Sequence, residues 1–263
     1  MTIRDVLVHL DRTPRSLARL EIATELAVRL RAQLVGLHIN CRHGARLGDS
    51  TDASLTEETF QSWVSQQGLE GEWRTTQDSA VEAFVRLGRC ADLTILGQPY
   101  YEGAQCGLSE REFVEILGRI GRPLLAVPYI GSFASIGGRA LAVWDSGPEA
   151  PRAVNAALPL LCRGQVMQLL VRDSQCAPDF HVSETGKEIL RHLSRHQVSA
   201  KVVRLFMEGG IERGEELLSH AADVGADLII VGAVVGARWW NVRRRTFMQT
   251  LIKKMTVPIL LVN

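Results

Sequence analysis

Short apolar runs alternate along the chain with longer segments in which apolar residues recur every three or four positions. Residues 6–10 and 140–144 are mostly apolar, as is typical of strands buried on both faces of a parallel sheet. Helical spacing follows each run, at residues 17–30 and 151–161. The pattern predicts buried strands joined by amphipathic helices.

The same alternation continues through both halves of the chain. Further strands are expected at residues 34–39, 71–75, 93–96, 166–171, 201–206 and 228–231, and further helices near 55–67 and 183–196. One more helix precedes the last strand of each half, which starts at Pro123 or Pro258. Because strands and helices alternate, we predict right-handed crossovers and a doubly wound, Rossmann-like α/β fold.

An internal repeat organises the chain into two domains. The segment 91–97 (ADLTILG) returns 135 positions later at 226–232 (ADLIIVG), and the last strand of each half repeats with the same offset. A stretch containing glycine and serine, residues 129–138, has neither helical nor strand periodicity. We place the junction there and predict domains at residues 1–130 and 138–263, each with a five-stranded parallel sheet.

The candidate sites follow from this topology. In a doubly wound sheet, ligands bind beyond the carboxyl ends of the strands, where the winding direction reverses. Asp11 and Asp145 follow the first strand of each half, and Gly97 and Gly232 end the fourth. These four residues therefore mark two candidate sites.

Composition narrows the class of protein. The hydrophobic fraction is 46%, and 30 Lys and Arg balance 29 Asp and Glu, which is typical of a soluble globular protein and gives no indication of a nucleic-acid or membrane partner. Charges near the N-terminus and the lack of a long apolar run lead us to expect a cytoplasmic protein. The five cysteines form no CxxC pair, which favours reduced thiols.

The order of these features resembles the universal stress protein family. An Asp follows strand one, strand four has the form Ala-Asp-Leu-apolar-Gly, and residues 255–261 (MTVPILL) are similar to the closing strand of that family. The resemblance covers nearly the whole chain twice. It implies a tandem protein with two adenine nucleotide alpha-hydrolase-like domains.

Family members that bind ATP carry a loop of the form G-x2-G-x9-G-(S/T) after strand four, whose final pair opens a helix with free N–H groups for phosphate. Aligned from Pro258, the second half has Gly232, Val235, Arg245 and Thr246 at the three glycine positions and the hydroxyl position. The loop is therefore degenerate, although Gly236 lies one residue late and residues 243–245 are all arginine.

The resemblance implies a degenerate site for ATP or AMP, with Mg, in the second half. Its expected residues are Asp145, Ser146, Val171, Gly232, Ala233, Gly236, Arg245, Thr246 and Phe247. Asp145 could face the adenosine or a metal-bound phosphate, or it could be a loop or helix-capping residue, and the same alternative holds for Asp11.

The first half lacks the loop. Gly97 is followed by residues 98–102 (QPYYE), and the positions aligned with Arg245 and Thr246 are Glu110 and Arg111. An acidic loop without the glycine–hydroxyl pair should repel phosphates, so we expect no ATP in this half.

Three hypotheses for the function follow. The first is a non-enzymatic stress-response protein that acts through binding and assembly, its halves pairing through their final strands, with a homodimer above that. The second is an ATP or AMP switch with slow hydrolysis, and the third is an adaptor or structural module for another small ligand. No GxSxG motif or comparable nucleophile signature indicates an efficient hydrolase.

Other side chains of the second-half loop leave alternatives open. The arginines at 243–245 could clamp an anion or form a solvated face. Trp239 and Trp240 could cover a ligand, contact a partner subunit or pack within their own domain.

In the first half, the possible metal ligands His9, His38, His43 and Cys41 lack the spacing of a zinc site.

Overall fold

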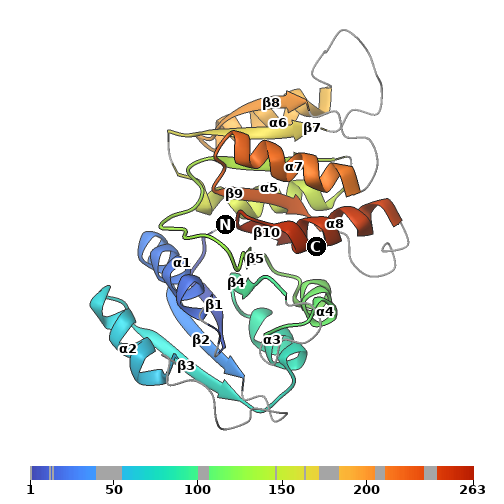
Figure 1. Cartoon of the computed structure of the whole chain (residues 1–263). Helices are drawn as coiled ribbons and strands as arrows, with labels where there is room; N and C mark the ends of the chain where they lie inside the picture. Colours follow the sequence, from blue (N-terminus) through green and yellow to red (C-terminus); the bar gives the residue numbers. More distant parts are fainter. Residues whose placement is uncertain are drawn as a thin grey trace. The chain divides into compact units, whose positions relative to one another are not determined.

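The computed structural model describes residues 2–11, 13, 15–39, 55–99, 107–145, 147–162, 164–171, 184–204, 211–233 and 242–263. The chain divides into two compact units, residues 2–134 and 135–263. Each unit is an alternation of strands and helices (Figure 1). The division falls inside the stretch 129–138.

The first unit contains five strands and four helices among the residues described. In chain order they are β1 Asp5–Leu10, α1 Arg15–Leu30, β2 Gln33–Ile39, α2 Glu57–Gln66, β3 Gly71–Thr76, α3 Ala80–Gly88, β4 Leu93–Gly97, α4 Glu110–Ile120 and β5 Leu124–Val127.

The second unit repeats this order. Its elements are β6 Ala140–Trp144, α5 Glu149–Ala157, a 3-10 turn at Leu158–Leu160, β7 Val166–Val171, α6 Glu184–Arg195, β8 Ser199–Arg204, α7 Ile211–Asp223, β9 Leu228–Gly232, α8 Val242–Lys254 and β10 Ile259–Val262.

Both units have the doubly wound sheet expected from the sequence. The strand order is β3-β2-β1-β4-β5 in the first unit and β8-β7-β6-β9-β10 in the second, and the neighbouring strands within each unit run parallel. The first strand of each unit therefore lies between the second and the fourth. The winding direction reverses at β1 and at β6, and their carboxyl ends are where this fold positions ligands.

Burial explains why the apolar runs form strands. Val6, Leu7 and Val8 of β1 are at most 2% exposed, since helices cover both faces of a doubly wound sheet. The predicted ranges 140–144 and 166–171 agree with β6 and β7.

Two details of the elements differ from the sequence pattern. Leu17 is 42% exposed although it shares the apolar spacing of α1, because the buried face of that helix is formed by residues such as Leu20, Ala23 and Ala27. The third strand of the second unit, Ser199–Arg204, begins two residues before the expected range 201–206, and residues 205 and 206 lie outside the described residues.

The repeated Ala-Asp-Leu motif has a structural role. The Asp92 carboxylate accepts the backbone N–H groups of Arg4 and Asp5, at 2.7 and 3.2 Å. In the second unit the Asp227 carboxylate accepts those of Gly137, Gly138 and Arg139, at 2.9 to 3.0 Å. The motif therefore holds the beginning of the first strand against the beginning of the fourth.

Gly137 is fixed by its surroundings. Its φ is 90°, in the left-handed region, and a Cβ at this position would lie 1.9 Å from the Leu160 carbonyl oxygen. The Gly137 carbonyl also accepts the N–H of Cys162 at 2.8 Å. Only glycine fits this close approach of two backbone segments.

Candidate functional site

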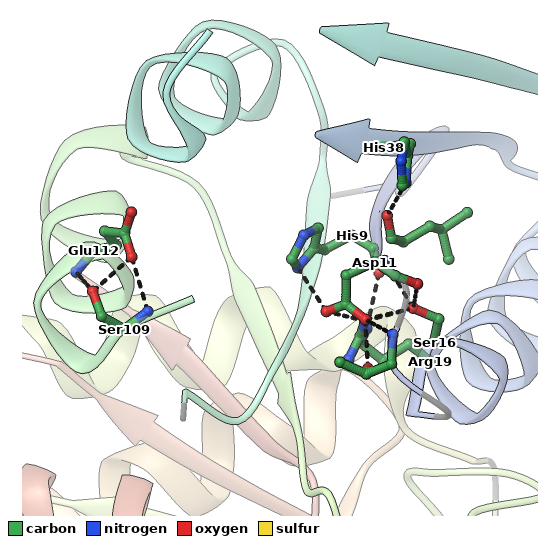
Figure 2. A network of polar contacts seen from close by, with 9 residues as sticks. His9, Asp11, Ser16, Arg19, His38, Ser109 and Glu112 are labelled. Atoms are coloured by element: carbon green, nitrogen blue, oxygen red, sulfur yellow. Dashed lines mark hydrogen bonds and ion pairs between the residues drawn. The ribbon is translucent and has the colours of Figure 1, made fainter. Parts of the chain in front are cut away.

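Asp11 lies at the carboxyl end of β1 within a network of polar side chains (Figure 2). One carboxylate oxygen accepts the N–H of Thr13 at 2.9 Å and the Thr13 hydroxyl. The other lies 2.7 Å from the guanidinium of Arg19. The Ser16 hydroxyl is 2.9 Å from the carboxylate and accepts the Asp11 N–H at 2.8 Å. The first-unit site thus holds a closed ion pair.

Arg19 is almost fully buried although it is charged. Its exposed fraction is 2%, its Nε donates to the His9 carbonyl at 2.8 Å, and its Nη2 donates to the Ser16 hydroxyl at 2.8 Å. Nη1 lies against Gly97, since a Cβ built there would be 2.5 Å from it. The guanidinium therefore connects the carboxyl ends of β1 and β4.

The network fixes the protonation of its members. Burial by itself would raise the pKa of the Asp11 carboxyl, but Arg19, His9 and the hydrogen bonds from Thr13 hold that pKa well below its usual range. Burial, reinforced by Arg19, lowers the pKa of His9 to about 3. Asp11 is ionised and His9 neutral at physiological pH. His9 lies 3.8 Å from Asp11 and packs edge-on against Phe84.

The beginning of α4 is occupied by the chain's own side chains. The Glu112 carboxylate accepts the Ser109 N–H at 2.9 Å and the Ser109 hydroxyl at 2.6 Å, while Ser109 Oγ accepts the Glu112 N–H at 3.3 Å (Figure 2). Glu110 adds a second acidic side chain to the first turn. This reciprocal capping places carboxylate where an anionic ligand would approach the helix.

Asp145 makes the same backbone contact as Asp11 but has different neighbours. Its carboxylate accepts the Gly147 N–H at 3.0 Å, as Asp11 accepts that of Thr13. Three polar residues around Asp11 have apolar counterparts 134 positions later. His9, Ser16 and Arg19 correspond to Val143, Ala150 and Ala153. The side chains that enclose Asp11 therefore have smaller, uncharged counterparts in the second unit.

Gly232 has a packing role. A Cβ at Gly232 would lie 2.5 Å from the Glu149 carbonyl carbon and 2.7 Å from the Ala150 nitrogen, so the first turn of α5 fills this space. The following residue, Ala233, is fully buried and donates its N–H to the Val262 carbonyl at 2.8 Å. Packing against α5 therefore accounts for the glycine at position 232, and no bound phosphate is needed to explain it.

A hollow of about 250 Å³ lies elsewhere in the second unit. Its lining includes Ala140 and Met167, near the amino ends of β6 and β7, and Cys162. It is thus at the opposite end of the sheet from Asp145. Within the described ranges, no group of three or more His, Cys, Asp or Glu is placed to hold a metal ion, and no helix has the length and apolar character to cross a membrane.

Solved structures with this fold span the whole chain. A universal stress protein from Archaeoglobus fulgidus is 13% identical with a TM-score of 0.69, over 98% of this chain and 96% of its own. The chain has the universal stress protein fold. A functionally unknown protein from Pseudomonas aeruginosa is 15% identical with a TM-score of 0.60, over 99% of this chain and 92% of its own.

The universal stress protein fold also resembles part of a transporter. The cytoplasmic domain of a prokaryotic cation chloride cotransporter is 10% identical with a TM-score of 0.50, over 98% of this chain and 95% of that one. No protein-family model matches the sequence, and no curated protein matches it either.

Within this fold, several expected site residues lie at one edge of the second sheet. Asp145 follows β6, Val171 ends the neighbouring β7, and Gly232 ends β9 on the other side. Val171 is 8% exposed. Ser146, Gly236, Trp239 and Trp240 lie outside the described residues, as do the side chains of Arg243 and Arg244.

The last helix of the second unit begins earlier than the family pattern implies. In that pattern the glycine–hydroxyl pair, here Arg245 and Thr246, opens the helix, whereas α8 begins at Val242, so Thr246 is its fifth residue. Free N–H groups belong to the first turn of a helix, which Thr246 has passed. Its carbonyl accepts the Thr250 hydroxyl at 2.9 Å, and Phe247 follows it in the same turn, half-buried.

An adenine nucleotide therefore fits the two units differently. In the first unit it does not fit, because Asp11 is already paired with the buried Arg19 and the Glu112 carboxylate caps the beginning of α4. In the second unit the Asp145 side fits, since the counterparts of His9, Ser16 and Arg19 are the small residues Val143, Ala150 and Ala153. On the phosphate side Gly232 and Thr246 keep the family pattern, whereas Arg245 replaces its third glycine and lies within α8.

Sequence reasoning missed Arg19. A usable signal was present, because Arg19 lies at helical spacing within the apolar face of α1, eight positions after Asp11. A charge on such a face calls for a buried partner, and the nearest acidic residue upstream was already a candidate.

Proposed function

We propose that this chain is a non-enzymatic, cytoplasmic stress-response protein of the universal stress protein type, which binds an adenine nucleotide in its second half only. The observation that carries the proposal is the contrast between the two equivalent aspartates. Asp11 is paired with the buried Arg19, whereas the residue at the position of Arg19 in the second unit is Ala153. The stress-response setting is inferred from the names of the structural neighbours. The choice of an adenine nucleotide is inferred from the residues of the site.

The proposed contacts lie at the carboxyl ends of β6 and β7. Asp145 would accept hydrogen bonds from the adenosine part of the ligand, and the backbone at Val171 would border it. The nucleotide would supply adenosine hydroxyls and a phosphate charge as recognition groups. Because Val235 and Arg245 replace the second and third glycines of the family's phosphate loop, we expect AMP and ATP to bind with similar affinity.

Equilibrium binding of labelled ATP and AMP tests this proposal. We expect saturable binding to the whole chain, with affinities for the two nucleotides within about fivefold, or about 1 kcal/mol. The Asp145→Asn variant should bind at least roughly tenfold more weakly, whereas Asp78→Asn, at a half-exposed position of the first unit, should bind as the wild type does. Wild-type protein without saturable binding would exclude the nucleotide.

The non-enzymatic part has its own test. Phosphate release from ATP should be the same for wild type and Asp145→Asn, because nothing around Asp145 among the described residues resembles a nucleophile–base pair. Release that depends on Asp145 would favour the ATP switch instead. For assembly, the resemblance supports a homodimer, and light scattering should give twice the mass of the chain.

A further inference from the structure

We propose that Arg19 is a built-in ligand of the first unit: its guanidinium fills a cation site at the carboxyl ends of β1 and β4, and truncating it leaves a site for a free guanidinium-type cation. This inference concerns the first unit alone and does not depend on nucleotide binding in the second. It starts from the contacts of the guanidinium, whose nitrogens face Asp11, Ser16, the His9 carbonyl and Gly97.

The acceptors of this site are held in place without Arg19. Thr13 orients the Asp11 carboxylate through its N–H and its hydroxyl. The His9 carbonyl is fixed because β1 pairs with β2, His9 opposite Leu37. Ser16 is anchored in α1 and to the Asp11 backbone. Removal of the arginine side chain should therefore leave a preorganised anionic site rather than a collapsed one.

The shape of the site selects the chemical class of the ligand. A carboxylate, a hydroxyl and a carbonyl surround the guanidinium, and a planar cation with several N–H donors can satisfy all three at once. The missing Cβ of Gly97 gives the space in which Nη1 lies. Methylguanidinium has both the charge and the planar donors, whereas urea has the shape without the charge.

The second unit shows that the fold accepts a small residue at this position. Ala153 is the counterpart of Arg19, and it is 1% exposed at the equivalent place in α5. Arg19→Ala therefore installs a residue that the same backbone already carries elsewhere in the chain. In this variant the Asp11 carboxylate has lost the cation with which it is paired in the wild type.

Thermal melts of the full-length Arg19→Ala variant with millimolar methylguanidinium test the proposal. We expect a lower Tm than wild type and a saturable rise of at least about 2 °C with methylguanidinium, relative to the same concentration of NaCl. Urea should give no rise, and neither should methylguanidinium on wild type, on Arg29→Ala from the same helix or on Asp11→Asn/Arg19→Ala, which lacks the carboxylate. If Arg19→Ala is unfolded alone, methylguanidinium should restore the folded signal.

A second measurement uses the unaltered chain. Labelling with phenylglyoxal, followed by mass spectrometry, should modify Arg19 at least roughly tenfold more slowly than Arg86, whose side chain is 60% exposed. Two results would each overturn the proposal: equal labelling of Arg19 and Arg86, or an Arg19→Ala variant that responds to methylguanidinium no more than wild type does, including failure to refold with it.

Discussion

Arg19 is stable inside the first unit because its contacts compensate for the loss of water. Removing one member of a buried ion pair costs about 3–5 kcal/mol, since the remaining charge has no partner. In the second unit apolar residues stand at the positions of His9, Ser16 and Arg19. Polar and apolar side chains are therefore both compatible with the same backbone contact of the aspartate.

His9 should make stability depend on pH. Its pKa is about 3 in the folded chain and about 6.5 when exposed, because burial, Arg19 and His38 together outweigh the attraction of Asp11. Between these values the unfolded chain binds a proton that the folded chain does not. The free energy of unfolding should thus fall as the pH drops from 6.5, by up to about 1.4 kcal/mol per pH unit.

Urea denaturation at a series of pH values measures this slope. In the His9→Val variant, which carries the residue of the second unit at this position, the fall in the free energy of unfolding between pH 6.5 and 4.5 should be lost. The His196→Gln variant, at an exposed position, should keep this pH dependence. The explanation fails if His9→Val retains the full slope.

Gly232→Ala should destabilise the protein rather than act through a ligand. The new Cβ would meet the backbone of Glu149 and Ala150, so α5 must move, at a cost of about 1–3 kcal/mol in the free energy of unfolding. Gly88→Ala is the matched control, because its nearest contact is a side-chain atom at 3.1 Å, and denaturation curves should leave it close to wild type. Equal stability of Gly232→Ala and wild type would refute the packing role.

Secondary structure was largely predictable from the sequence because buried parallel strands are uninterrupted apolar runs. The ranges of β6 and β7 show this. The start of α8 was not predictable from the family pattern, since arginine favours helix and nothing in residues 242–245 stops one. The exposed Leu17 of α1 shows in the same way that spacing identifies a helix more securely than it identifies the buried side.

Asp227→Ala should weaken the second unit at the beginning of β6. The carboxylate satisfies three N–H groups, and leaving such groups without an acceptor costs about 1–3 kcal/mol. Hydrogen exchange at Gly138 and Arg139 should accelerate by at least roughly tenfold, while Asp223→Ala at an exposed site should not change it. Unchanged exchange would mean that the motif does not anchor this strand.

At the scale of the whole molecule, the repeat predicted two domains of one fold because the offset between repeated segments is nearly constant. The side chains that form the two sites were harder to predict from the sequence. The difference between the loops after the two fourth strands could be read from the sequence. The buried Arg19–Asp11 pair could not, because it depends on the packing of a helix against a strand, and a charged residue on its own is usually solvated.

Hydrogen exchange of the whole chain with and without AMP should separate the two units. We expect slower exchange near the carboxyl ends of β6 and β7 and no change at β1 and β4, because the latter site is already closed by Arg19. Protection of equal size in both units would contradict the asymmetry.

The tight fit of Gly137 against Leu160 sets a limit on how the duplicated chain can change in length. Gly137, Gly138 and Arg139 donate their N–H groups to Asp227, and the Gly137 carbonyl accepts the N–H of Cys162, so a residue inserted between Gly137 and β6 would shift the register of that strand. An insertion that lengthens the connection between the two units without disturbing these contacts therefore belongs between the end of β5 and Ile136.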